Sequence, residues 1–258
     1  MQRFSTLTAC VIASLLGFVA AACGADRHVY VIYDVSLSYQ FNHKIGWDDD
    51  RDAILDAIKR VGGAITDTDF FSFLPMDGSV RYDCDMARLG KDYAHGAELF
   101  GATVDVQDGH DGQLSTGSMD WNSAWSAHIE KFRANARTFK LTDWTKNTDL
   151  VGALYRASYM FRKYPARKNY LLIFSDLDDD PLDPGSLRGL CGTLDLRNVE
   201  VHVVDFGDKL SKYVKNPRTR PSASMRLANF SSLMQRAHAA PFKQDTHEEI
   251  FDRLGVDD

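Results

Sequence analysis

The stretch VYVIYDVSLS, residues 29–38, decides the fold, because a continuous apolar run stops abruptly at oxygen-bearing side chains. Such a run, at 29–33, is typical of a strand buried on both faces of a parallel sheet between helix layers. Three later runs have the same character: DFFSFLP (69–75), YLLIF (170–174) and VEVHVVDF (199–206). Together these runs predict the strands of a largely parallel sheet.

Amphipathic segments alternate with the predicted strands. Apolar side chains recur at helical spacing in residues 48–61 and again in 149–163. Residues 228–238 and 245–254 predict two more helices near the end of the chain. Strand and helix therefore alternate throughout, which predicts an α/β, Rossmann-like three-layer sandwich with helices on both faces of the sheet.

One strand is expected to run against the others. Asp77-Gly78-Ser79 separates the run at 69–75 from VRYDC (80–84), and a short Asp-Gly turn between apolar runs is typical of a β-hairpin. Residues 80–84 are thus predicted as an antiparallel edge strand. The whole sheet is expected to hold about six strands in the order 3-2-1-4-5-6, with the edge strand as number 3.

Residues 86–147 fit the alternating pattern least well and are interpreted as an inserted loop and helix. Within them, a helix is predicted at about 121–138, with Trp121 and Trp125 on its apolar face. That face either packs into the core or docks a partner. Because no composition shift divides the chain, a single domain over residues 27–255 is expected.

The oxygen-bearing side chains after the first strand are candidates for a metal site. Asp34, Ser36 and Ser38 occupy alternate positions at the carboxyl end of that strand, where ligand sites of open α/β sheets lie. Hard cations such as Mg²⁺ prefer oxygen ligands of this kind. The alternative is a turn in which Asp34 and Ser36 bond only to the backbone.

Two later segments carry similar side chains. Thr148 opens the predicted helix at 149–163, where a helix N-cap is the alternative role for its hydroxyl. Asp176 directly follows the strand at 170–174, and its alternative is membership of a solvated acidic loop.

These three segments together resemble the von Willebrand factor A family and its metal-ion-dependent adhesion site. The family's motif is DxSxS after the first strand, a Thr opening a later helix and an Asp after the fourth strand. Its five places are filled here, in the family's order, by Asp34, Ser36, Ser38, Thr148 and Asp176. The resemblance implies that the hydroxyls ligate the metal directly and that the carboxylates act through water. It implies Mg²⁺ as the cation, with Mn²⁺ and Ca²⁺ as alternatives.

The resemblance extends along the chain. The hairpin at 69–84 is similar to the family's antiparallel edge strand, and residues 199–207 are similar to its fifth strand. Residues 230–254 are similar to its closing helix, strand and helix. One departure is Leu177, where the family commonly has glycine.

The function that this resemblance implies is metal-dependent recognition of another protein, with no catalysis. The cation would keep one coordination position open for an Asp or Glu of the partner. The loop at 208–226 carries six basic side chains and a single acidic one, and Lys212, Lys215 and Arg218 are its candidate partner-binding residues. Such a patch would steer an acidic partner toward the metal.

Enzymatic motifs are absent from the sequence. It contains no HExxH, GxSxG, Walker A or GxGxxG pattern. Two alternatives remain open: a metal-assisted hydrolase or phosphatase that uses the Asp34 cluster, and a structural envelope lipoprotein with a degenerate site.

The first 22 residues are expected to be an export signal. Residues 6–22 are an uncharged apolar run that ends in small residues, too short for a comfortable transmembrane helix. Cys23 then becomes the N-terminus or, as in a bacterial lipoprotein, carries a lipid anchor. We therefore expect a periplasmic, cell-envelope or secreted protein, attached to a membrane only if Cys23 is acylated. No disulfide is predicted between Cys84 and Cys191, which fall on opposite sides of the predicted sheet.

The overall charge argues against one class of partner. Lys and Arg total 30 against 36 Asp and Glu, a net charge of -6. Nucleic-acid binding needs a basic surface to neutralise phosphates, so nucleic acid is not expected as a partner.

Overall fold

The structure, a computed structural model, describes residues 25–36, 39, 47–65, 69–76, 125–127, 129–130, 133–134, 148–179, 192–206 and 221–256. Its elements along the chain are β1 (Ala25–Asp34), α3 (Trp47–Gly63), β2 (Asp69–Met76), α7 (Leu150–Lys163), β3 (Ala166–Phe174), β4 (Val199–Val204), α8 (Ala223–Arg236), β5 (Lys243–Asp245) and α9 (His247–Leu254). The predicted export signal at 1–22 lies outside the described residues, as do Cys23, Cys84 and Cys191.

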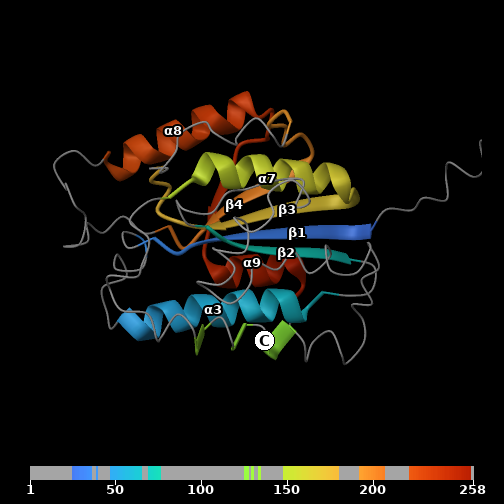
Figure 1. Cartoon of the computed structure of the whole chain (residues 1–258), viewed down its shortest axis with the longest axis vertical. Helices are drawn as coiled ribbons and strands as arrows, with labels where there is room; N and C mark the ends of the chain where they lie inside the picture. The colour runs from blue at the N-terminus through green and yellow to red at the C-terminus, as the bar shows by residue number, and fades with distance from the viewer. Residues whose placement is uncertain are drawn as a thin grey trace, which may run out of the picture.

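The sheet has five strands in the order β2-β1-β3-β4-β5 (Figure 1). All four described strand pairs are parallel. The predicted α/β class and the mostly parallel sheet are thereby confirmed. The predicted edge strand at 80–84 lies outside the described residues, so the six-strand order stays a prediction.

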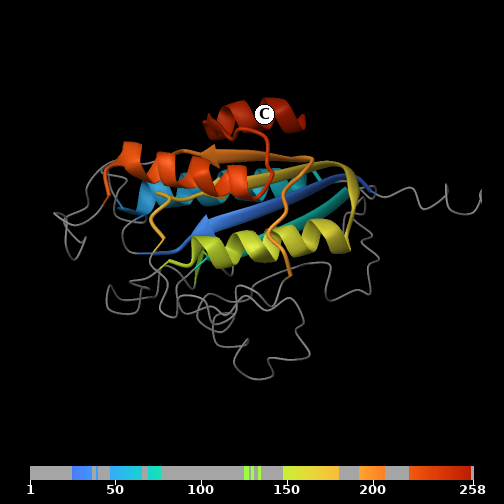
Figure 2. The same ribbon diagram turned by 90° about the horizontal axis from the view of Figure 1, so that it is seen from above.

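Helices cover both faces of this sheet. Helices α7 and α8 lie on one face, and α3 and α9 lie on the other, as Figures 1 and 2 both show. Alternate residues of β1 supply the two cores: Val29, Val31 and Tyr33 face α3, whereas Tyr30 and Ile32 face α7. Burial on both faces is what the continuous apolar runs predict.

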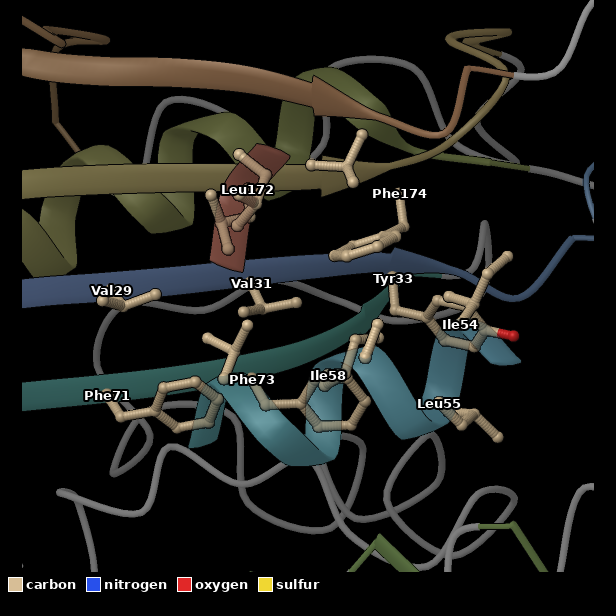
Figure 3. Close-up of a cluster of buried hydrophobic side chains, with 14 of the residues drawn as sticks. Val29, Val31, Tyr33, Ile54, Leu55, Ile58, Phe71, Phe73, Leu172 and Phe174 are labelled. Carbon is tan, nitrogen blue, oxygen red and sulfur yellow. The ribbon is translucent and has the colours of Figure 1, made fainter. Parts of the chain in front are cut away.

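The core between α3 and the sheet is shown in Figure 3, where Ile58 lies beside Phe73 of β2 and Ile54 lies near Tyr33 of β1. Leu55 and Phe71 belong to the same cluster. Each of these side chains is at most 5% exposed. Burial of one such side chain stabilises the fold by roughly 1.5–3 kcal/mol. The helical stripe predicted over residues 48–61 is therefore the face that holds α3 on the sheet.

Of the predicted helix at 121–138, the structure describes residues 125–127, 129–130 and 133–134, all helical. Trp125 is 1% exposed and packs edge-on against Phe71, with ring centroids 4.8 Å apart. Its indole Nε1 donates a 3.0 Å hydrogen bond to the carbonyl of Lys59. Trp125 is therefore a core residue and not a docking residue. Trp121 lies outside the described residues.

The bounds of α8 correct the prediction for that region. The helix begins at Ala223, five residues before the predicted start at 228, and Ser222 caps it by accepting a hydrogen bond from the amide of Met225. The early turn was missed because its first residues carry no apolar stripe. Within the part of the chain that the structure describes, no helix is long and apolar enough to cross a membrane.

Candidate metal centre

Four of the candidate ligands lie at or near the ends of elements that meet at the carboxyl end of the sheet (Figure 1). Asp34 is the last residue of β1, Ser36 follows it closely, and Asp176 lies just beyond the end of the neighbouring strand β3. Thr148 lies two residues before the start of α7, directly before its N-cap Asp149. All four are buried, with exposures of 0% for both aspartates, 2% for Ser36 and 3% for Thr148. Ser38, the fifth predicted ligand, lies outside the described residues.

The Asp34 carboxylate is held by two hydrogen bonds. Its Oδ1 accepts from the amide of Ser36 at 2.8 Å, and its Oδ2 accepts from the hydroxyl of Ser175 at 2.6 Å. The first bond is the local turn that the sequence left open as an alternative. The second bond joins the end of β1 to the loop after β3, so Asp34 does more than close a turn. Ser175 was missed, although a Ser directly before Asp176 at a strand end was a visible signal.

The electrostatics of the site favour a cation. Burial, and then the nearby charge of Asp176, raise the pKa of Asp34 to about 7, against the opposing effect of its hydrogen bonds from Ser175 and Ser36. Two buried carboxylates that repel each other are costly unless a positive charge lies between or beside them. The guanidinium of Arg226, 3.7 Å from Oδ2 of Asp176, supplies part of that charge. A divalent ion would supply more and would favour the ionised form of both carboxylates.

Tyr39 is a further described residue of this end of the sheet. It is 0% exposed and its ring lies 6.3 Å from that of Tyr33 at the end of β1. Burial raises its pKa well above the usual value, and the charges of Asp34 and Asp176 act in the same direction. Its phenol therefore stays neutral beside the two carboxylates.

The N-cap of α7 is Asp149 and not Thr148. The Asp149 Oδ1 accepts a 2.9 Å hydrogen bond from the amide of Gly152, which satisfies one free donor of the first turn. The alternative role for Thr148 is thereby wrong. The buried side chain of Thr148 lies one residue before the cap. It is thus at the N-terminal end of α7.

The loop after β3 is buried where it follows the strand. Ser175 and Asp176 are 0% exposed and Leu177 is 4% exposed, so the solvated acidic loop is wrong for these residues. Leu177 adopts a left-handed backbone with φ 59°. Glycine enters this region without penalty, whereas a side chain makes it costly. The loop therefore keeps the conformation that suits glycine, although it carries Leu.

Arg226 was counted in the basic loop at 208–226, and this assignment is corrected by the structure. It lies in the first turn of α8, is 3% exposed and donates a 2.6 Å hydrogen bond to the carbonyl of Asp176. It is therefore part of the site's support and not of its exposed rim. Lys212, Lys215 and Arg218 lie outside the described residues.

The donor set fits a hard cation better than a metal that prefers sulfur or imidazole ligands. Among the described residues, no group of three or more His, Cys, Asp and Glu side chains could hold a metal ion. The candidate ligands are instead two carboxylates and the hydroxyls of Ser36 and Thr148, a mixture of oxygen donors. Oxygen donors suit Mg²⁺, Ca²⁺ and Mn²⁺.

Comparison with known proteins gives structural neighbours only, since no protein-family model and no curated protein matches the chain. Proximal thread matrix protein 1 from the mussel byssus is 9% identical, with a TM-score of 0.39, over 91% of this chain and 47% of that one. The pilus adhesin SpaC from Lactobacillus rhamnosus GG is 10% identical, with a TM-score of 0.46, over 91% and 29%. The PilB minor pilin from Streptococcus sanguinis, as its D319A mutant, is 11% identical, with a TM-score of 0.44, over 91% and 61%. The chain thus spans less than two thirds of the length of each of these proteins.

Proposed function

We propose that this chain is an exported, non-catalytic protein of the von Willebrand factor A type that recognises another protein through a bound divalent cation. Asp34, Ser36, Ser38, Thr148 and Asp176 would hold the cation, with Mg²⁺ as the first candidate. The hydroxyls would be direct ligands, and the carboxylates would act through water.

The observation that carries this proposal is the burial of four of these side chains, among which the charges of Asp34 and Asp176 are close enough to interact. They come from three segments that are far apart in the sequence, and each sits at the end of a strand or helix. Side chains on the ends of rigid elements hold a fixed geometry, which a metal site requires. Asp34 and Asp176 repel each other, and the guanidinium of Arg226, 3.7 Å from Asp176, offsets part of this repulsion. A bound cation would offset more of it.

An acidic side chain of the partner would complete the coordination of the metal. An ion held by neutral hydroxyls and two carboxylates remains electrophilic toward one more anionic oxygen. In this proposal Lys212, Lys215 and Arg218 lie near the metal and steer the partner by long-range attraction. The chain would act at the cell surface or in the periplasm, with Cys23 as its lipid anchor if that residue is acylated.

One observation favours the alternative of a metal-assisted hydrolase. In the metal-free chain, burial and the charge of Asp176 raise the pKa of Asp34 to about 7, the value expected of a general base near neutral pH, although a bound cation would lower it. Against this, the Asp34 carboxylate is 0% exposed and already accepts two hydrogen bonds. Recognition is therefore the first candidate, and hydrolysis the second.

Calorimetric titration with Mg²⁺ tests the metal site. Asp34→Asn should abolish binding, because it removes one of the two charges that attract the ion. Asp69→Asn is the matched control, since Asp69 is also buried, at 2% exposed, but pairs with Arg27 at the opposite end of the sheet. Unchanged Mg²⁺ binding in Asp34→Asn would mean that the cluster is only a turn.

Recognition needs a second experiment. A pull-down from envelope extract should retain a partner in Mg²⁺ and lose it in chelator, and Thr148→Val should behave as the chelated protein does. A partner retained equally well in chelator contradicts the metal bridge. Turnover of phosphate esters or peptides that disappears in Asp34→Asn would favour the hydrolase instead.

A further inference from the structure

A single peptide unit after β3 is held at both of its ends. The carbonyl of Asp176 accepts a hydrogen bond from Arg226 Nη1 at 2.6 Å. The amide of Leu177, the other half of the same peptide unit, donates to the hydroxyl of Ser175 at 3.0 Å. This peptide precedes the left-handed Leu177, where the backbone is costly for a residue with a side chain.

The guanidinium of Arg226 makes a short hydrogen bond to this peptide. Its Nη1 lies 3.7 Å from Oδ2 of Asp176, which is too long for a hydrogen bond, whereas its bond to the carbonyl is short. The guanidinium also lies over the ring of Phe206, 5.6 Å from its centroid, at the end of β4. Arg226 is thus located by α8 and by Phe206, and it reaches the loop across 50 residues of sequence.

We infer that Arg226 is a positioning residue of the candidate metal site, which fixes the 176–177 peptide and so aims the Asp176 carboxylate. A charge-assisted hydrogen bond to a buried carbonyl is about twice as strong as a neutral one. With Ser175 on the amide side, it holds a loop conformation that Leu177 would otherwise leave. The expected effect on metal affinity rests on the proposed function. The hydrogen bond between Arg226 and the carbonyl of Asp176 does not depend on a metal.

The consequence for the metal follows from the role of supporting residues. Side chains that orient ligands without touching the ion typically change metal affinity by about 10- to 100-fold when they are removed. Arg226→Met should therefore weaken Mg²⁺ binding by roughly that factor. If Arg226 acted only through its positive charge, its removal would strengthen Mg²⁺ binding, because a cation near the site repels Mg²⁺. The direction of the change thus separates positioning from simple charge.

The test combines calorimetry with hydrogen exchange. Arg226→Met is compared with Arg27→Met. The control variant breaks the partly buried ion pair between Arg27 and Asp69 at the opposite end of the sheet. In the metal-free protein, exchange of the Leu177 amide should become at least about tenfold faster in Arg226→Met only, in line with the loss of a strong hydrogen bond. Arg226→Gln replaces Arg226→Met if circular dichroism shows that the latter does not fold.

Each outcome decides a separate question. Unchanged exchange at Leu177, or tighter Mg²⁺ binding in Arg226→Met, would overturn the positioning role. Faster exchange together with weaker Mg²⁺ binding, both absent from Arg27→Met, supports it. If the unmodified protein binds no Mg²⁺, the proposed function fails, and the exchange rate still decides whether Arg226 fixes the loop.

Discussion

The hydroxyl of Ser175 donates a 2.6 Å hydrogen bond to the carboxylate of Asp34, and both side chains are 0% exposed. The bond connects the ends of two neighbouring parallel strands, β1 and β3. It holds Oδ2 of Asp34, whereas the amide of Ser36 holds Oδ1.

Ser175→Ala should weaken Mg²⁺ binding by about 10- to 100-fold, because Asp34 loses the partner that orients it. Ser158→Ala is the matched control, since Ser158 is also 0% exposed and its hydroxyl bonds the carbonyl of Asp195 at 2.9 Å. Both variants should lose about 1–3 kcal/mol of stability, as expected for a broken buried hydrogen bond. Calorimetry in which the two variants bind Mg²⁺ equally well would contradict a role for Ser175 in the site.

Mg²⁺ should raise the free energy of unfolding, because only the folded chain brings the ligands together. At a free Mg²⁺ concentration of 100 times the dissociation constant, the gain is about 2.7 kcal/mol. Thermal melting with Mg²⁺ and with chelator measures it. Thr148→Val, which keeps the shape but removes the hydroxyl, should show little gain. Thr246→Val, which removes only the N-cap of α9, should keep the full gain despite a lower melting temperature.

His28 should make the fold sensitive to acid. Burial lowers its pKa from 6.5 to about 4, although a hydrogen bond to the carbonyl of Tyr164 opposes the shift. The folded pKa is therefore below the unfolded one, and the unfolded chain takes up the proton first. The stability is complete above pH 6.5 and falls toward pH 4, by up to about 1.4 kcal/mol per pH unit.

Urea denaturation of the wild type and of His28→Gln between pH 7 and pH 4 measures this effect. The variant should be less stable at pH 7, and the difference between the two proteins should shrink as the pH falls. Other titrating groups contribute to both proteins and cancel in that difference. A difference that stays constant with pH would show that His28 does not titrate in this way.

Gly62 and Gly63 at the end of α3 should respond oppositely to the same substitution. A Cβ on Gly62 would lie 1.8 Å from Nε1 of Trp125, whereas a Cβ on Gly63 would meet nothing within 4 Å. Gly62→Ala should thus cost about 1–3 kcal/mol, since the indole must move out of its place against Phe71. Gly63→Ala should be neutral or stabilise by up to about 1 kcal/mol. Chemical denaturation of both variants checks the sign of each change.

The sequence was informative where the signal is local. Continuous apolar runs predicted β1 to β4, because burial on both faces of a strand removes the polar alternation. Oxygen-bearing side chains at the ends of those runs indicated Asp34 and Asp176, since parallel strands bring their carboxyl ends to one edge. The resemblance to a known motif added Thr148.

What could not be predicted depends on contacts between distant segments. Arg226 looked like a member of a basic loop, because nothing in its neighbourhood indicates that it reaches a carbonyl 50 residues away. Asp149 and Thr148 are equally good N-cap residues by type, and only the backbone of α7 decides between them. The left-handed backbone of Leu177 is likewise imposed by its surroundings and is not favoured by its own side chain.

The parallel pairing of β1 with β3 also bears on the kinetics of folding. Asp34 and Ser175 are separated by 141 positions, so the site forms only after β1 and β3 have paired across that length of chain. Closing so long a segment costs conformational entropy before the contact repays it, so such contacts form slowly. Interactions absent from the transition state change the unfolding rate and leave the folding rate nearly untouched. A cation that binds only the completed site would therefore slow unfolding and prolong the lifetime of the native state. It would not speed the folding of the chain.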